Sequence, residues 1–121
     1  MLQTVNPQTM KDRTKQLALG IITLCRTLPR TDEARIITRQ LLRSVTSVAA
    51  NYRAACRARS TAEFIAKLGI VLEEADETHF WIELLQDARI ASEEKLLPIL
   101  TEANQLVSIF VASVRTAKSN R

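Results

Sequence analysis

Residues 40–85 read QLLRSVTSVAANYRAACRARSTAEFIAKLGIVLEEADETHFWIELL. Near the middle of this stretch, Ser60 and Glu63 form a capping box, because a serine and a glutamate at this spacing mark the first turn of a helix. Beyond the box, apolar or small residues recur alternately three and four positions apart, at Phe64, Leu68, Val71, Ala75, Thr78, Ile82 and Leu85. This spacing places them on one face of a long helix and is typical of the seam of a helical bundle.

The same kind of pattern extends on both sides of this stretch. Asn6-Pro7, Thr31 and Ser92 are suitable helix starts, because their side chains or ring geometry favour the first turn. The predicted helices span approximately 7–28, 32–58, 61–89 and 93–117. Short connections make consecutive helices antiparallel neighbours. The sequence therefore predicts an all-α fold, an antiparallel up-down-up-down four-helix bundle with long second and third helices, as a single domain over residues 1–121.

The composition supports this fold class. Hydrophobic residues make up 46% of the chain and aromatic residues only 4%, with two glycines and three prolines. Sandwiches and barrels need more turns and more bulky strand residues than this. We find no long apolar run for a membrane span and no signal-peptide core at the start, so we expect a cytoplasmic protein with no membrane partner. Cys25 and Cys56 lack metal-ligand spacing, and we expect them to be buried thiols.

Additional apolar residues flank the predicted seams. They are Ile36, Leu42, Ile65, Leu72, Trp81, Ile99 and Leu106. A monomer of this size leaves part of such a wide stripe exposed, which favours self-association into a homo-oligomer. The alternative is a thicker core within one chain.

Charge is distributed unevenly along the chain. Residues 1–60 contain 11 Lys or Arg against 3 Asp or Glu, whereas residues 61–121 contain 6 against 10. Arg35, Arg39 and Arg43 are spaced four apart, so they lie on one helical face. The candidate nucleic-acid-binding residues are Arg35, Arg39, Arg43, Arg53, Arg57, Arg59 and Lys67. Three interpretations remain open: contact with phosphates, pairing with the acidic third helix within or between chains, and a plain solvated surface.

Any nucleic acid bound by this surface would be recognised through its backbone. Readers of single strands stack bases on exposed aromatic residues, but Phe64 and Phe110 fall on predicted core positions. The expected partner is therefore structured RNA or duplex DNA.

Enzymatic chemistry finds little support in the sequence. Asp76 and His79 have the spacing of a di-iron bundle motif, but such sites need two pairs and this chain has one histidine. The sequence contains no glycine-rich phosphate loop, and nothing pairs either cysteine with His79 as nucleophile and base. We therefore expect a non-enzymatic protein with no catalytic residues, cofactor or metal.

The central stretch also resembles one known family. Gln40-Leu41-Leu42-Arg43-Ser44 and Ser47-Val48-Ala49-Ala50-Asn51 are similar to the "Q-x-x-R-x … S-[IV]-x-x-N" pattern of the four-helix-bundle proteins encoded within 23S ribosomal RNA intervening sequences. Arg57 to Phe64 resembles the "R-x-S-x-x-E-F" turn of that family, and Leu68 to Glu77, with Trp81 and Leu84, its third helix. The matched positions include Arg43, Asn51, Arg59, Glu63, Asp76 and Glu77. The family often has "A-E-G" after the Asn, where this chain has Tyr52-Arg53-Ala54.

The resemblance implies a bacterial four-helix bundle that assembles as a homopentamer and has no established catalytic activity. Relatives of the family include accessory proteins of diversity-generating retroelements, which bind nucleic acid and contact a reverse transcriptase. By resemblance, the expected partners are therefore further copies of this chain, RNA or DNA, and a reverse transcriptase if the gene is linked to a retroelement.

Overall fold

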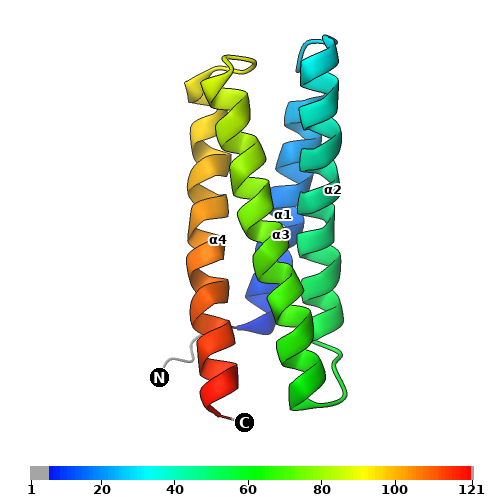
Figure 1. Ribbon diagram of the computed structural model, residues 1–121, viewed down its shortest axis with the longest axis vertical. Helices are drawn as coiled ribbons and strands as arrows, with labels where there is room; N and C mark the ends of the chain where they lie inside the picture. The colour runs from blue at the N-terminus through cyan, green and yellow to red at the C-terminus, as the bar shows by residue number, and fades with distance from the viewer. Residues whose placement is uncertain (1–5, 121) are drawn as a thin grey trace.

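Four helices make up the part of the chain that the computed structural model describes, residues 6–120. They are α1 (Pro7–Cys25), α2 (Asp32–Ala55), α3 (Thr61–Asp87) and α4 (Glu93–Ser119). Figure 1 shows them packed side by side along the long axis, with successive helices running in alternating directions. The prediction of an all-α four-helix bundle is confirmed. Residues 1–5 and 121 of the predicted 1–121 domain lie outside the described residues.

Each helix begins at a side chain that accepts hydrogen bonds from its first turn. Asn6 Oδ1 accepts from the N–H groups of Gln8 at 2.9 Å and Thr9 at 3.2 Å. Thr31 caps α2 and Ser92 caps α4 in the same way. The backbone N–H groups of the first turn of a helix would otherwise lack hydrogen-bond partners. Short polar side chains at these positions therefore determine where the helices start, as predicted.

The capping box at the start of α3 has one unexpected detail. Ser60 Oγ accepts from the N–H of Glu63 at 3.0 Å, as predicted. The Glu63 carboxylate, however, accepts from the N–H of Arg59 at 3.1 Å, one residue before the cap. The glutamate therefore fixes the α2–α3 turn as well as the first turn of α3.

The predicted C-terminal ends of the first three helices were two or three residues too late. α1 ends at Cys25 rather than 28, where hydrogen bonds from Thr27 to Leu24 and from Leu28 to Cys25 tighten the chain into a turn. Pro29 also disfavours helical geometry at the residue before it. α2 ends at Ala55 rather than 58, where hydrogen bonds from Arg57 to Ala54 and from Ala58 to Ala55 tighten the chain into a turn. α4 continues to Ser119, two residues past its predicted end. With 27 residues it is as long as α3, whereas α2 has 24.

The end of α3 depends on a residue that no sequence signal marked. Arg89 has a φ of 58°, the left-handed region that usually selects glycine. This geometry lets the Ile90 N–H reach back to the Leu85 carbonyl at 3.0 Å and the Arg89 N–H reach Gln86 at 3.0 Å. The resulting C-terminal motif ends α3 at Asp87 rather than 89.

The predicted seams form the core. Their buried members include Ile21, Leu41, Val45, Val71, Ile82 and Phe110. Leu106, predicted to flank the core, is instead fully buried, and Val107 is half-buried. Buried polar groups are also paired: Thr78 Oγ1 lies 2.9 Å from Ser44 Oγ and links α3 to α2 inside the core. No buried side-chain N or O atom of the described residues lacks a hydrogen-bond partner.

The expectation that no segment is long and apolar enough to span a membrane was wrong for α4. By length and composition alone, Glu93–Ser119 passes that test, and 17% of its most apolar stretch is buried in the structure. Leu96, Ala103, Leu106 and Phe110 on this helix belong to the bundle core. In this structure α4 is one of the four helices of the bundle, with an apolar composition.

The two ends of the bundle differ in shape. Figure 1 shows that the first turns of α3 and the last turns of α4 extend beyond the adjacent ends of α1 and α2, at the bottom of the view. The shorter α1, with 19 residues, is one reason. The α2–α3 turn, which carries several of the candidate arginines, lies at this end.

Candidate nucleic-acid interface

The arginines predicted to form one stripe on α2 have different surroundings. Arg35, Arg39 and Arg43 are all exposed. Arg35 lies 3.9 Å from Asp32 Oδ1, and both side chains are mostly in solvent, so this pair contributes little. Among the described residues, Arg39 has no carboxylate within ion-pair distance. The stripe therefore presents two largely free cations at its N-terminal end.

Arg43 is paired with the acidic helix. Its Nη1 and Nη2 donate to the two Glu74 carboxylate oxygens at 3.2 Å and 3.1 Å, and Nη2 also donates to Glu77 Oε1. The hydrogen bonds that Arg43 donates to Glu74 and then to Glu77 raise the pKa of its guanidinium above its ordinary value. For this residue, the structure shows the intrachain pairing that the sequence left open.

Glu77 is held in its charged form by two neighbours. The Trp81 indole N–H donates to Glu77 Oε1 at 3.2 Å. This hydrogen bond lowers the Glu77 pKa most, desolvation opposes it, and the hydrogen bond and charge of Arg43 lower the pKa further, so the net shift is downward. The group Arg43, Glu74, Glu77 and Trp81 is therefore a hydrogen-bonded network on the outside of α2 and α3, in which one cation faces two carboxylates and the Arg43 charge is already paired.

The remaining candidates lie near the α2–α3 turn. Arg53, Arg57 and Arg59 are exposed, and none of them has a carboxylate within ion-pair distance among the residues that the structure describes. Lys67 follows on α3 and is half-buried. The first three residues fall within seven positions of one another, so we name them the turn arginines. They form the densest group of unpaired positive charge among the candidates.

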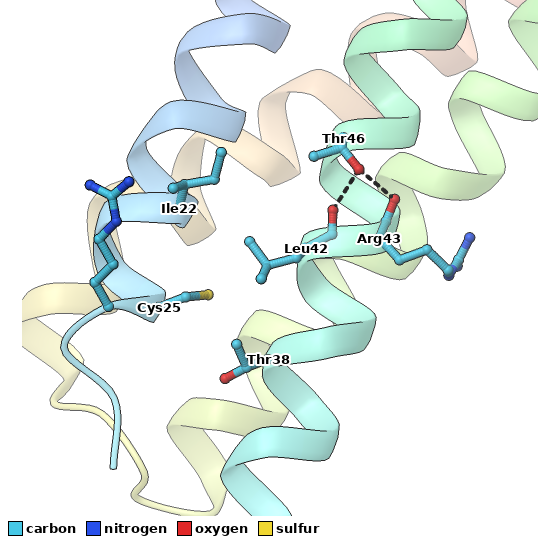
Figure 2. A pocket seen from close by; sticks show the side chains of 7 residues that line it. Ile22, Cys25, Thr38, Leu42, Arg43 and Thr46 are labelled. Atoms are coloured by element: carbon cyan, nitrogen blue, oxygen red, sulfur yellow. Dashed lines mark hydrogen bonds between the residues drawn. The ribbon is translucent and has the colours of Figure 1, made fainter. Parts of the chain in front are cut away.

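A hollow of about 600 Å³ lies between α1 and α2 (Figure 2). Ile22, Cys25 and Leu42 give it an apolar wall, and Thr38 and Thr46 lie along its side. In Figure 2 the Arg43 side chain points away from Cys25 and Ile22. Burial raises the pKa of the Cys25 thiol to about 11, although a hydrogen bond with Thr38 opposes this. Cys25 is therefore a neutral thiol at neutral pH rather than a nucleophile.

A second hollow, of about 770 Å³, lies at the end of the bundle where the turn arginines are. Phe64 and Cys56 are among its lining residues, together with Arg59. Phe64 is only half-buried, so its assignment to the closed core was wrong. Cys56 is exposed, which also corrects the prediction that both thiols are buried. Sequence periodicity missed this hollow because it does not show where neighbouring helices end.

The histidine pairs with a carboxylate on its own helix. His79 Nδ1 lies 3.5 Å from Glu83 Oε1, whereas Asp76, its predicted partner in the motif, is exposed. Within residues 6–120, no group of three or more His, Cys, Asp or Glu side chains lies close enough together to hold a metal ion.

Comparisons with known proteins agree with the fold and with the central motifs. Residues 8–112 match the model of a family described as 23S rRNA-intervening sequence protein. A similar solved structure is that of a protein of unknown function from the S23 ribosomal protein family of Bacteroides thetaiotaomicron. It is 32% identical in sequence, with a TM-score of 0.82 over 90% of this chain and 97% of that chain. No curated protein matches the chain. Neither description names a catalytic activity.

Proposed function

Because this chain belongs to the family of 23S rRNA-intervening sequence proteins, we propose that it is a non-enzymatic, oligomeric protein that binds RNA or DNA through a basic surface. The turn arginines are the centre of this surface, with Arg35, Arg39 and Lys67 as its extension along α2 and α3. Arg43 contributes to the packing of α2 on α3 instead.

The observation that carries the proposal is the free charge of the turn arginines. Arg53, Arg57 and Arg59 have no ion-pair partner among the described residues, although the chain has 13 carboxylate side chains. A guanidinium pairs well with phosphate oxygens and releases condensed counterions when it does so. Such contacts do not depend on the base sequence of the nucleic acid, so we expect the protein to recognise the sugar-phosphate backbone.

The test is a salt titration of binding to a folded RNA and to a DNA duplex. We expect the triple variant Arg53→Ala/Arg57→Ala/Arg59→Ala to bind more weakly to both. Its plot of log affinity against log salt should be shallower by about 2 to 3 units, if each arginine contacts one phosphate. The matched control is Arg26→Ala/Arg30→Ala/Lys95→Ala, which removes the same charge near the opposite end of the bundle.

A second candidate function is an assembly module whose charged faces serve self-association. The observation that favours it is the Arg43–Glu74–Glu77 network, since it shows that basic and acidic faces of this protein can pair with each other. On this alternative, the triple variant would change the oligomeric state, and wild-type protein would bind neither nucleic acid at low salt.

We also propose that the protein forms a homo-oligomer. The expected state is a pentamer, which the resemblance to the intervening-sequence proteins implies. Exposed apolar side chains on all four helices support self-association: Leu19, Ile36, Ile70, Phe80 and Leu97 are each at least 40% exposed. A cytoplasmic location accompanies RNA binding in this proposal. The resemblance adds a reverse transcriptase as protein partner if the gene is linked to a retroelement.

A further inference from the structure

The hollow beside the turn arginines is lined by residues of all four helices and of the α2–α3 turn, and its lining is mixed. Tyr52 and Leu68, which are buried, form its floor, and half-buried Phe64 lies on its α3 side. Tyr52 is itself held in place by Phe110, with ring centroids 5.6 Å apart. The ring at the floor is therefore fixed, whereas Phe64 has part of its surface open to solvent.

The α4 side of the hollow supplies hydrogen-bonding groups. Ser113, Thr116 and Asn120 line it at one-turn spacing, and Ser60 and Thr61 lie at the start of α3 opposite. The Ser113 hydroxyl already donates to the Ile109 carbonyl, and Ser60 Oγ already accepts from the Glu63 N–H. The Thr116 hydroxyl and the Asn120 amide can both donate and accept, so this side suits a planar ligand with donors and acceptors at its edge.

The charge on the lining of the hollow is positive. Among the described residues that line the hollow, Arg59 is the only charged one. The nearby Glu63 is already bonded to the Arg59 backbone N–H through its carboxylate. Arg53 and Arg57 lie on the last turns of α2 and in the turn that follows it. A ligand with an apolar flat part and an attached phosphate matches this arrangement.

We propose that the hollow takes an unpaired nucleobase of a bound RNA, stacked on Phe64, with the adjoining phosphates on the turn arginines. The inference rests on the proposed function and adds a preference for RNA with an extruded nucleotide. The volume of about 770 Å³ falls within the usual range of small-ligand sites and has room for a base with its ribose. An aromatic ring accepts any base, so the preference concerns an unpaired nucleotide rather than a sequence.

The experiment compares two hairpin RNAs that differ only in one bulged nucleotide, by fluorescence anisotropy at fixed salt. We expect wild-type protein to bind the bulged RNA at least about fivefold more tightly. This factor corresponds to the lower end of the free energy gained when one base stacks on an aromatic ring. Phe64→Leu, which keeps an apolar side chain but loses the ring, should lose most of that preference. Ala112→Trp should abolish it, because Ala112 lines the hollow and is exposed, so a larger side chain fills the space without entering the core.

The matched control is Phe80→Leu, which removes an exposed ring from the same helix outside the hollow. It should keep the preference for the bulge, and circular dichroism should show unchanged helix content for all three variants. A direct measurement is photo-crosslinking from an iodouridine at the bulge. The expected adduct is on the tryptic peptide of residues 60–67, in which Phe64 is the only aromatic residue.

Equal affinity of wild-type protein for the two RNAs would overturn the inference, and so would a preference that survives Ala112→Trp. Binding of anilinonaphthalene sulfonate that Ala112→Trp abolishes, without any preference for the bulge, would assign the hollow to a small amphipathic anion instead. These outcomes leave backbone binding intact. Failure of the proposed function is a different result, in which neither RNA binds even at low salt.

Discussion

At the scale of single residues, Arg89 illustrates a helix end that the sequence does not predict. A non-glycine residue at positive φ is strained by contact between its Cβ and the backbone, at a cost of about 1 kcal/mol. We predict that Arg89→Gly raises the free energy of unfolding by about 0.5 to 1 kcal/mol, after the greater freedom of glycine in the unfolded chain is included. Urea denaturation measures this, and Arg89→Ala is the control that retains the strain. A glycine variant no more stable than the alanine variant would contradict the explanation.

The two cysteines differ in a way that alkylation can detect. With a pKa of about 11, only about one Cys25 thiol in a thousand is ionised at pH 8, and the side chain is partly buried. We predict that iodoacetamide modifies the exposed Cys56 first and that Cys56→Ser leaves a slowly reacting protein. Mass spectrometry over time provides the measurement. Rapid labelling of the Cys56→Ser variant would mean that Cys25 is accessible and ionised more than the structure indicates.

Residue-level prediction from sequence was accurate where a pattern repeats and inaccurate where it stops. Val71 and Ile82 were correctly assigned to the core, because burial recurs along a continuous helix. Phe64 follows the same pattern but lies in the first turn of α3, a part of the helix that extends beyond the adjacent ends of α1 and α2 (Figure 1). The exposure of Phe64 depends on where the neighbouring helices end. The spacing of apolar residues within α3 carries no information about those ends.

At the scale of elements, the Arg43–Glu74–Glu77 network joins α2 to α3 and makes their packing pH-dependent. The Glu77 pKa is lower in the folded protein than its ordinary value, so the unfolded state binds more protons as the pH falls. This contribution to stability is present above the ordinary glutamate pKa of about 4.3 and is lost as the pH falls through the folded-state value.

We therefore predict that the stability of wild-type protein decreases as the pH falls below the ordinary glutamate pKa of about 4.3 and that Glu77→Gln makes this decrease smaller. Urea denaturation at several pH values provides the measurement. Arg43→Met should have the same effect, because it removes a cation that lowers the Glu77 pKa. Glu93→Gln, at an exposed position outside the network, is the control. An unchanged pH profile in both network variants would show that the pairing contributes nothing in solution.

The starts of these elements were predictable and their ends less so. Capping needs a short polar side chain at one position, which Asn6, Thr31, Ser60 and Ser92 supply and the sequence displays. C-terminal ends depend on backbone geometry that several residue types can adopt, as Arg89 does. The same reasoning explains why the start of α3 was placed correctly while α2 was extended too far.

At the scale of the whole molecule, the exposed apolar residues predict self-association. Multi-angle light scattering at micromolar concentration should return a multiple of the 13.6 kDa chain mass, with five copies as the expected number. Phe80→Asp on α3 should lower that mass if α3 is part of the interface, since the ring is 50% exposed in the single chain. Thr23→Asp is a control at an exposed polar position on α1. A mass of one chain for wild-type protein would contradict the oligomer.

The central claim concerns nucleic-acid binding by the turn arginines, and one measurement tests it most directly. It is the affinity of wild-type protein, the Arg53/Arg57/Arg59 triple alanine variant and the Arg26/Arg30/Lys95 control for one folded RNA, titrated across salt concentration. We predict steep salt dependence for wild type and control and a weaker, shallower response for the triple variant, with its oligomeric mass unchanged. Identical curves for all three proteins, or no binding by wild type at low salt, would contradict the claim.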